Sequence, residues 1–404
     1  MEITQGETFP FRESVTLFLR PFFRPLHGLV RTPPFPAVIL VPSALFVPVS
    51  RSTRGAPGTG RDGADQPCPA AFLPGSDAVC WQATSQASRH LANVLQRRMN
   101  RHFIIKGGMC PPARAGDTER TMQSILLNDG HSIPSVGFGV FQVPADGSTF
   151  KAVLCALQAG YRHIDTAAAY LNEAEVGQAL RESGLPRDEV FVTSKLWIQD
   201  YGYEAARAGI RASLDNLGLD CLDLYLLHQP YFDVQGAWKA LEEARDEGLV
   251  KSIGVSNFTP NFWKRHVPHF ATLPCLNQVE FHPFFQQREL RALLARDRVA
   301  LAAWSPLGHG NSALLAHPLV TALAGKYHCD PCRLILRFEL QEGCIVLPKS
   351  TSPAHIASNL RLFDFCLDEG DMERLRGLDT GRGMRDPEEA GRAESLLARY
   401  RVHP

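Results

Sequence analysis

The chain has 404 residues, of which 45% are hydrophobic and 21% are charged. That length exceeds one ordinary domain but is short for three, and the composition excludes the disordered, collagen-like and membrane-spanning classes for the chain as a whole. The 42 basic residues equal the 42 acidic residues, so no overall charge points to nucleic acid as a partner.

The first part of the chain differs in pattern from the rest. Residues 1–121 are rich in Pro, Arg, Ser and Gly and show no clear alternation of strands and helices. We predict that they form a low-complexity, disordered extension, or upstream sequence absent from the mature protein, with Met122 as a natural start of the folded part. The apolar stretch 37–49 is too short for a membrane span and contains Pro42 and Pro48, so no membrane insertion is predicted.

The ten cysteines are scattered through the chain rather than arranged as a disulfide framework. Cys329 and Cys332 have the spacing of a redox pair or of half a zinc site, but no second ligand pair accompanies them. Pro331 between them suits the first turn of a helix that starts there. We therefore predict reduced thiols, no metal site and a cytoplasmic location.

From residue 123 onward, short apolar runs alternate with amphipathic helical stretches. A β-hairpin is predicted over 125–133, around the turn sequence Asn128-Asp129-Gly130. Strands follow at 136–138, 163–165, 190–194, 222–227, 252–255, 276–280, 300–304 and 344–347. The predicted helices between them include 172–183, 203–217, 235–247 and 288–296. Eight such units predict an α/β fold, a (β/α)8 TIM barrel over residues 122–404, with its active site at the carboxyl ends of the strands.

Polar residues stand at the ends of three consecutive predicted strands. Asp165 ends the second strand and Tyr170 follows shortly after it, while Lys195 and His228 follow the third and fourth strands. Each residue alone is more often part of a structural ion pair or a capped strand end. Because the carboxyl ends of barrel strands meet on one face, the four together indicate a proton-transfer site.

These four residue types suit the reduction of a carbonyl group, which needs a hydride on carbon and a proton on oxygen. Tyr170 would supply the proton as general acid, and the Lys195 ammonium would lower its pKa. Asp165 would keep Lys195 protonated and oriented through a buried ion pair. His228 would hydrogen-bond the substrate oxygen and hold it near the hydride donor.

The segments HIDTAAAY, TSKLW, LYLLHQP, GVSNF, NQVEFHP, AWSPLG and LPKS occur in the order found in aldo-keto reductases. This resemblance covers roughly residues 123–386, the whole predicted barrel, and is strongest to the branch of diketogluconate reductases and protozoal prostaglandin F synthases. It implies an oxidoreductase that uses NADPH to reduce aldehydes and ketones to alcohols. It also places four residues in the catalytic tetrad of the family: Asp165, Tyr170, Lys195 and His228.

The resemblance further implies a set of cofactor-binding residues. Ser256, Asn257 and Gln278 would hydrogen-bond the nicotinamide carboxamide, and Trp304 would stack on the nicotinamide ring, where the family commonly has Tyr. The residues that would contact the pyrophosphate and the adenosine phosphate are Ser305, Leu307, Gly308, Lys349, Ser350, His355 and Asn359.

Two substitutions bear on the preference between NADPH and NADH. In the family pattern K-S-x-x-x-x-R-x-x-E-N, this chain has His355 for Arg and Ser358 for Glu. Histidine lacks the planar fork of arginine and its permanent charge, so binding of the 2′-phosphate should weaken. We predict a modest preference for NADPH, with NADH tolerated.

Three residues are predicted to line the substrate pocket. Phe141 stands where the family commonly has Trp, Trp197 follows the lysine, and Gln229 replaces a Trp that often follows the histidine. The alternative for Phe141 and Trp197 is simple core packing. The connection after His228 is short, which predicts an open, shallow site for small aldehydes, dicarbonyls or keto sugars rather than for steroids.

Two other functions remain open at this stage. The barrel could be a nicotinamide-binding regulatory subunit of a larger complex, in which turnover is incidental. The segment before Met122 could also be an interaction or targeting module attached to a working enzyme. Apart from these alternatives, we expect a monomer whose partner is a small carbonyl compound.

Overall fold

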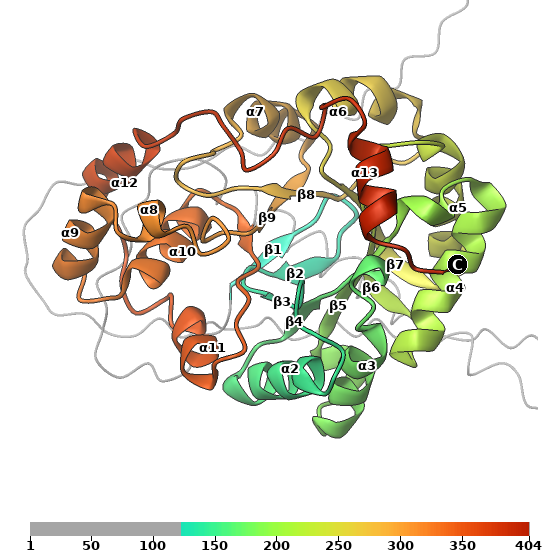
Figure 1. Cartoon of the computed structure of the whole chain (residues 1–404), viewed down its shortest axis with the longest axis horizontal. Coiled ribbons are helices and arrows are strands. Elements are labelled where there is room, and N and C mark those ends of the chain that lie inside the picture. Colours follow the sequence, from blue (N-terminus) through green and yellow to red (C-terminus); the bar gives the residue numbers. More distant parts are fainter. Residues whose placement is uncertain (1–122, 404) are drawn as a thin grey trace, which may run out of the picture. The chain divides into compact units, whose positions relative to one another are not determined.

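The structure is a computed structural model that describes residues 123–403 (Figure 1). The predictions for residues 1–121, including the apolar stretch 37–49, lie outside the described residues. The described part begins with the predicted hairpin, in which β1 (Ser124–Leu126) and β2 (Ser132–Pro134) pair antiparallel. Gly130 in its turn has a φ of 95°, a conformation that glycine adopts without steric cost.

The other strands form one parallel sheet whose order follows the chain. They are β3 (Phe138–Gly139), β4 (His163–Asp165), β5 (Phe191–Leu196), β6 (Leu222–Leu227), β7 (Val250–Ser256), β8 (Leu276–Glu280), β9 (Ala300–Trp304) and β10 (Ile345–Val346). The sheet closes because Val136, just before β3, forms a parallel bridge with Val346. The predicted (β/α)8 barrel with its hairpin is thus confirmed.

Helices surround the barrel (Figure 1). They are α2 (Ser148–Ala159), α3 (Glu173–Glu182), α4 (Tyr203–Leu217), α5 (Val234–Asp246), α6 (Pro260–His266), α7 (Arg288–Asp297), α8 (Ser312–Leu315), α9 (Pro318–Lys326), α10 (Pro331–Gln341), α11 (Pro353–Leu360), α12 (Glu369–Arg376) and α13 (Arg392–Arg399). The helices predicted from periodicity correspond to α3, α4, α5 and α7, with bounds that agree closely. Strand ends were predicted less well, since β5 continues through Leu196 and therefore contains Lys195.

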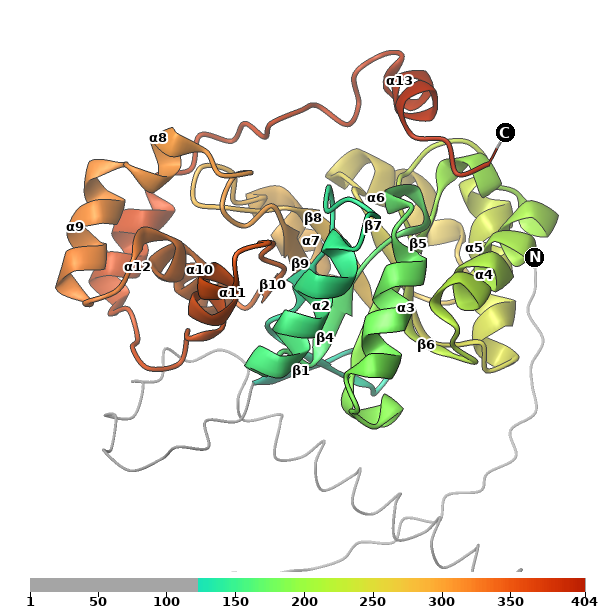
Figure 2. The ribbon, with the colours of Figure 1, turned by 60° about the horizontal axis from the view of Figure 1, so that its bottom comes forward.

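The core has an inner and an outer layer because barrel strands are covered on one face by the barrel interior and on the other by helices. All of β6 is buried. Leu224 and Leu226 belong to an inner cluster with Ile133 of the hairpin, while Tyr225 and Leu227 pack with helix residues such as Leu241. The hairpin therefore fills one end of the barrel, and Figure 2 shows α13 beyond the opposite end.

The Cys329–Cys332 segment caps a helix, as predicted. Pro331 is the first residue of α10, and the Asp330 side chain accepts a hydrogen bond from the Arg333 amide at 2.9 Å. Both cysteines are free thiols. Within residues 123–403, no group of His, Cys, Asp and Glu side chains has the arrangement of a metal site, and no helix there is long and apolar enough to cross a membrane.

Candidate active site

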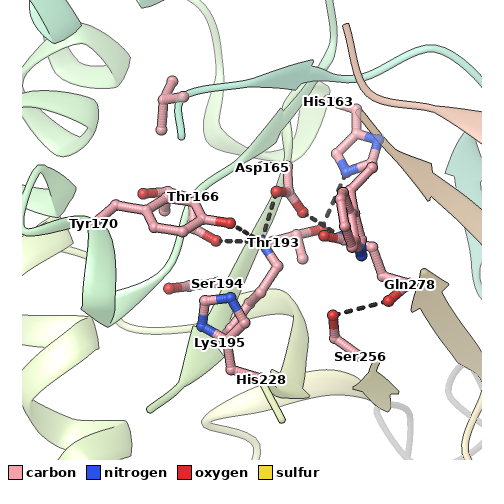
Figure 3. A network of polar contacts seen from close by, with 12 residues as sticks. His163, Asp165, Thr166, Tyr170, Thr193, Ser194, Lys195, His228, Ser256 and Gln278 are labelled. Atoms are coloured by element: carbon pink, nitrogen blue, oxygen red, sulfur yellow. Dashed lines mark hydrogen bonds and ion pairs between the residues drawn. The ribbon is translucent and has the colours of Figure 1, made fainter. Parts of the chain in front are cut away.

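Three adjacent strands bring the four predicted catalytic residues together (Figure 3). Asp165 is the last residue of β4, and Tyr170 ends the short 3-10 helix that follows it. Lys195 lies within β5, and His228 directly follows β6. Because β4, β5 and β6 pair in parallel, their carboxyl ends present these side chains to the same face of the barrel.

A buried ion pair is the centre of this group. The Lys195 ammonium nitrogen lies 2.6 Å from Asp165 Oδ1 and donates to the Thr166 carbonyl oxygen at 2.7 Å. The other carboxylate oxygen, Asp165 Oδ2, accepts a hydrogen bond from Gln278 Nε2 at 2.7 Å. Burial lowers the pKa of Lys195, while the Asp165 carboxylate opposes this shift and favours the ammonium form. These contacts fix Lys195 in place, and the Asp165 carboxylate compensates its charge.

The Tyr170 hydroxyl lies at the edge of this ion pair. Its oxygen is 3.5 Å from Lys195 Nζ, and the same nitrogen is 5.1 Å from the centre of the tyrosine ring. Burial raises the pKa of Tyr170 well above its ordinary value, and the charge of Asp165 adds to this shift. This shift is set mainly by burial, so the expected effect of Lys195 on the pKa of Tyr170 stays a prediction. Tyr170 therefore carries its proton at neutral pH.

The His228 ring completes the group. Its centre lies 5.6 Å from that of Tyr170 and 5.0 Å from that of Trp197, both in edge-to-face orientation. Burial, with a further contribution from the Lys195 charge, lowers the pKa of His228 well below its ordinary value. The imidazole is therefore neutral, and one of its nitrogens is a hydrogen-bond donor.

A second histidine, His163, lies behind Asp165 and was not singled out from the sequence. Its Nε2 is 3.1 Å from Thr193 Oγ1, and it is the first residue of the HIDTAAAY segment. The side chain is buried, and this burial lowers its pKa to about 4. A buried, neutral histidine under the ion pair couples the stability of the barrel to pH.

This coupling predicts that the protein loses stability in mild acid. In the unfolded chain a histidine binds its proton near pH 6.5, whereas folded His163 does so only near pH 4. The stabilising contribution is present above pH 6.5 and is lost as the pH falls toward 4. We expect the free energy of unfolding in urea to drop by about 2 kcal/mol from this group between pH 7 and pH 5. In His163→Gln the free energy of unfolding should fall less between these two pH values. An unchanged pH dependence in this variant would contradict the assignment of the effect to His163.

The residues predicted for the nicotinamide carboxamide form a hydrogen-bonded cluster beside the tetrad. Ser256 Oγ donates to the Gln278 carbonyl oxygen at 2.8 Å. Asn257 Nδ2 donates to the His228 carbonyl oxygen at 2.9 Å, and Asn257 Oδ1 accepts from Trp304 Nε1 at the same distance. These bonds fix the side chains of Asn257 and Trp304 next to His228.

The residues predicted for the phosphates are only partly brought to the same cleft. Ser305, Leu307, Lys349 and His355 line it. The residues that do not contribute to its lining are Gly308, Ser350 and Asn359. Ser350 Oγ instead accepts a hydrogen bond from the Ser352 amide, and Asn359 is buried. Ser358, the residue in place of the family glutamate, donates to Asp330 Oδ2 at 3.0 Å.

The cleft has a volume of about 1400 Å³ and lies at the carboxyl ends of the strands. Asp165, Tyr170 and His228 line it, as do the three residues predicted for the substrate pocket, Phe141, Trp197 and Gln229. Trp197 also packs in a small buried cluster with Leu396, so its role as a cleft wall and its role in packing coexist. A cleft of this size accommodates a large cofactor together with a small substrate.

The C-terminal segment forms one wall of the cleft, a feature that the sequence analysis missed. Residues 381–400 contribute many of the lining side chains. Trp197 Nε1 donates to the Tyr400 carbonyl oxygen at 2.8 Å, which fixes α13 to the barrel. The signal in the sequence was weak: Leu396, Leu397 and Tyr400 are apolar residues at helical spacing beyond the last recognisable motif.

Comparison with known proteins agrees with this arrangement. Residues 135–380 match the model of the "Aldo/keto reductase family". The chain belongs to the aldo/keto reductase family. An aldo-keto reductase of Mycolicibacterium smegmatis is 47% identical over 261 residues, which cover 64% of this chain and 94% of that protein.

Two further relatives belong to the predicted branch of the family. The 9,11-endoperoxide prostaglandin H2 reductase of Trypanosoma cruzi is 41% identical and covers 63% of this chain and 91% of its own length. The methylglyoxal reductase DkgA of Escherichia coli is 39% identical and covers 66% of this chain and 98% of its own length. The predicted placement in the branch is therefore confirmed.

Solved structures of family members show the same fold. An aldo/keto reductase from Brucella melitensis is 42% identical, with a TM-score of 0.62 over 64% of this chain and 100% of that chain. A Bombyx mori aldo-keto reductase solved in complex with NADP is 34% identical, with a TM-score of 0.61 over 67% of this chain and 95% of that chain. As a member of this family, the protein is an NAD(P)H-dependent oxidoreductase that reduces carbonyl groups with NADPH as its cofactor.

Proposed function

We propose that this aldo-keto reductase reduces small aldehydes, dicarbonyls or keto sugars to alcohols, with Tyr170 as the general acid. The observation that carries the proposal is the position of the Tyr170 hydroxyl, 3.5 Å from the ammonium of a buried Lys195–Asp165 pair and on the wall of the cleft. The neutral ring of His228 adjoins the tyrosine on the same wall. Tyr170, beside the ion pair, would be the proton donor, and His228 would be a hydrogen-bond donor at the same place.

In this mechanism the protein supplies the proton and the orientation. NADPH, when bound, supplies the hydride that adds to the carbonyl carbon. His228 donates a hydrogen bond to the carbonyl oxygen and orients it toward Tyr170. As negative charge develops on that oxygen, Tyr170 transfers its proton to it, and the Lys195 ammonium stabilises the phenolate that remains. The rise in the pKa of Tyr170 through burial keeps this proton in place until the oxygen becomes basic.

The residues of the cleft fit the cofactor. Trp304 lies half-buried on the cleft wall with its indole nitrogen bonded to Asn257, so its ring offers a flat surface for the nicotinamide. Gln278 uses its amide nitrogen for Asp165, and its amide oxygen has no partner among residues 123–403, so it would accept from the carboxamide. The exposed Lys349 makes no ion pair within the described part of the chain and would meet a phosphate.

Steady-state NADPH oxidation tests the proposed substrate class and cofactor preference in one assay. We expect methylglyoxal and 4-nitrobenzaldehyde to be reduced with higher kcat/KM than a ketosteroid. With either aldehyde, NADPH should exceed NADH by a modest factor, since Lys349 is present but His355 replaces arginine. A ketosteroid that outperforms both aldehydes would refute the substrate class. Equal or better efficiency with NADH would refute the cofactor preference.

Other features of the protein are proposed on the sequence alone. We propose that residues 122–404 form the catalytic domain, that the enzyme is monomeric, and that it is cytoplasmic. Among the described residues, no observation favours a regulatory subunit over an enzyme.

A further inference from the structure

Tyr170 lies in a short loop whose two ends are joined by a side-chain hydrogen bond. The loop runs from Thr166, directly after β4, to Asn172, directly before α3. Thr166 Oγ1 donates to Asn172 Oδ1 at 3.0 Å. Both residues are buried, so the bond is shielded from water and is stronger than an exposed one. Tyr170 is therefore presented by a loop that is closed at its base.

The side chain of Asn172 does not serve its own helix. Asn172 occupies the N-cap of α3, where asparagine usually accepts a hydrogen bond from the first turn, but its side chain makes no such bond. Its amide nitrogen instead donates to the carbonyl oxygens of Val140 and Val143, each at 3.1 Å. Because carbonyl oxygens only accept, these two bonds leave the amide oxygen to face Thr166. The side chain therefore joins the Tyr170 loop to the segment that follows β3.

The same amide also holds the aromatic residue that packs against Tyr170. The two carbonyl groups that it bonds lie on either side of Phe141 in the chain. The Phe141 ring centre is 5.0 Å from that of Tyr170. Asn172 therefore fixes both the loop that carries the tyrosine and the ring that faces it.

The loop contains a strained residue directly after Tyr170. Leu171 has a φ of 57°, and its side chain is 61% exposed. A leucine in the left-handed region is sterically unfavourable, and such a conformation persists only where the surrounding structure holds it. Because this side chain is mostly exposed, its packing contributes little to that. The Leu171 amide bonds the Ala168 carbonyl oxygen at 3.1 Å, and the bond between Thr166 and Asn172 spans the whole loop.

The base of the loop also contacts Lys195. The lysine ammonium group donates to the Thr166 carbonyl oxygen at 2.7 Å, on the residue whose side chain closes the loop (Figure 3). The Tyr170 hydroxyl lies 3.5 Å from the same nitrogen. Since one loop sets both distances, a change at its base alters the separation of Tyr170 from Lys195.

From these contacts we propose that Thr166 and Asn172 are positioning residues, whose hydrogen bond sets the place of the Tyr170 hydroxyl relative to Lys195 and the substrate oxygen. Neither residue lines the cleft, so each acts through Tyr170. The inference rests on the proposed function, in which Tyr170 is the proton donor. Proton transfer needs a donor within hydrogen-bond reach, and a small displacement of that donor costs rate.

Thr166→Val tests the proposal on the full chain, because valine has nearly the shape of threonine but lacks its hydroxyl. We expect kcat/KM for 4-nitrobenzaldehyde with NADPH to fall about tenfold or more, mainly through kcat, while the Kd for NADPH stays unchanged. Thr166→Ser keeps a hydroxyl and should restore most of the lost rate. If Thr166→Val does not fold, Thr166→Ala removes the same hydroxyl and takes its place in the comparison.

A second comparison asks whether the effect passes through Tyr170. In a Tyr170→Phe background, Thr166→Val should cause no further loss of kcat/KM, because the hydroxyl that it positions is already absent. A further loss as large as in the wild type would show that Thr166 acts by another route and would overturn the proposal.

The control is Tyr161→Phe, which removes a different buried hydrogen bond, from the Tyr161 hydroxyl to the Ile356 carbonyl oxygen at 3.2 Å. Tyr161 does not line the cleft, and this variant should keep the kcat/KM of the wild type. An unchanged kcat/KM in Thr166→Val, an equal loss in Tyr161→Phe, or no recovery in Thr166→Ser overturns the positioning role and leaves the proposed function standing. A wild-type enzyme that reduces no aldehyde would instead reject the proposed function.

Discussion

Replacing Tyr170 by phenylalanine is expected to lower kcat/KM for aldehyde reduction by about 100-fold or more, the usual contribution of a general acid. The variant removes the hydroxyl that lies 3.5 Å from Lys195 and leaves the developing alkoxide without a proton donor. The ring itself should stay in place, because its contacts with Phe141 and His228 involve the aromatic faces and edges. The loss is therefore expected in kcat rather than in cofactor binding.

The measurement is NADPH oxidation with 4-nitrobenzaldehyde, together with a titration of NADPH binding by fluorescence. Tyr203→Phe is a matched control, since it removes a hydroxyl that bonds Glu243 outside the cleft. It should retain activity close to that of the wild type. A Tyr170→Phe enzyme that kept more than about a tenth of the wild-type kcat/KM would exclude Tyr170 as the general acid.

Replacing Asp165 by asparagine is expected to destabilise the protein by about 3–5 kcal/mol, because it leaves the buried Lys195 ammonium without its counter-ion. The Lys195 side chain is fully buried and that of Asp165 nearly so. Burial already lowers the pKa of Lys195, and without the Asp165 carboxylate only the charge of Glu173 opposes this shift. The pKa of Lys195 should therefore fall further, and turnover should fall with it.

A double-mutant cycle separates the ion pair from general damage to the core. The free energy of unfolding in urea at pH 7 is measured for Asp165→Asn, for Lys195→Met and for the double variant. If the cost arises from an unpaired charge, the double variant should be more stable than Asp165→Asn alone, because both charges are then absent. Strict additivity of the two single changes would show that the pair contributes no coupling.

Much of the fold could be predicted from periodicity. The helix predicted at 203–217 coincides with α4, and the apolar run at 222–227 coincides with β6. Both depend on local patterns of side chains, which bury one helical face or a whole strand. Strand ends were less certain, since Lys195 was expected after its strand and lies within it. A polar residue ends an apolar run in the sequence, but pairing with β6 continues the strand.

The sequence predicted which residues form the candidate site but not the hydrogen bonds that connect them. The sequence could not show that Gln278, expected at the carboxamide, also donates to Asp165, because β4 and β8 are distant in the chain. It also missed the wall formed by α13, which depends on a hydrogen bond between Trp197 and Tyr400. Long-range contacts of this kind leave no periodic signal.

The sequence by itself determined the barrel and the family, and it singled out Asp165, Tyr170, Lys195 and His228 as candidate catalytic residues, because these follow from local patterns and ordered motifs. Only the tertiary structure decided in which direction burial shifts the pKa values of Tyr170, Lys195 and His228. It placed Tyr170, partly buried, in the wall of the cleft, where desolvation raises its pKa. The physical reason is desolvation. The free-energy cost of removing a phenolate from water depends on the groups packed around it, and the order of residues along the chain does not show which groups these are.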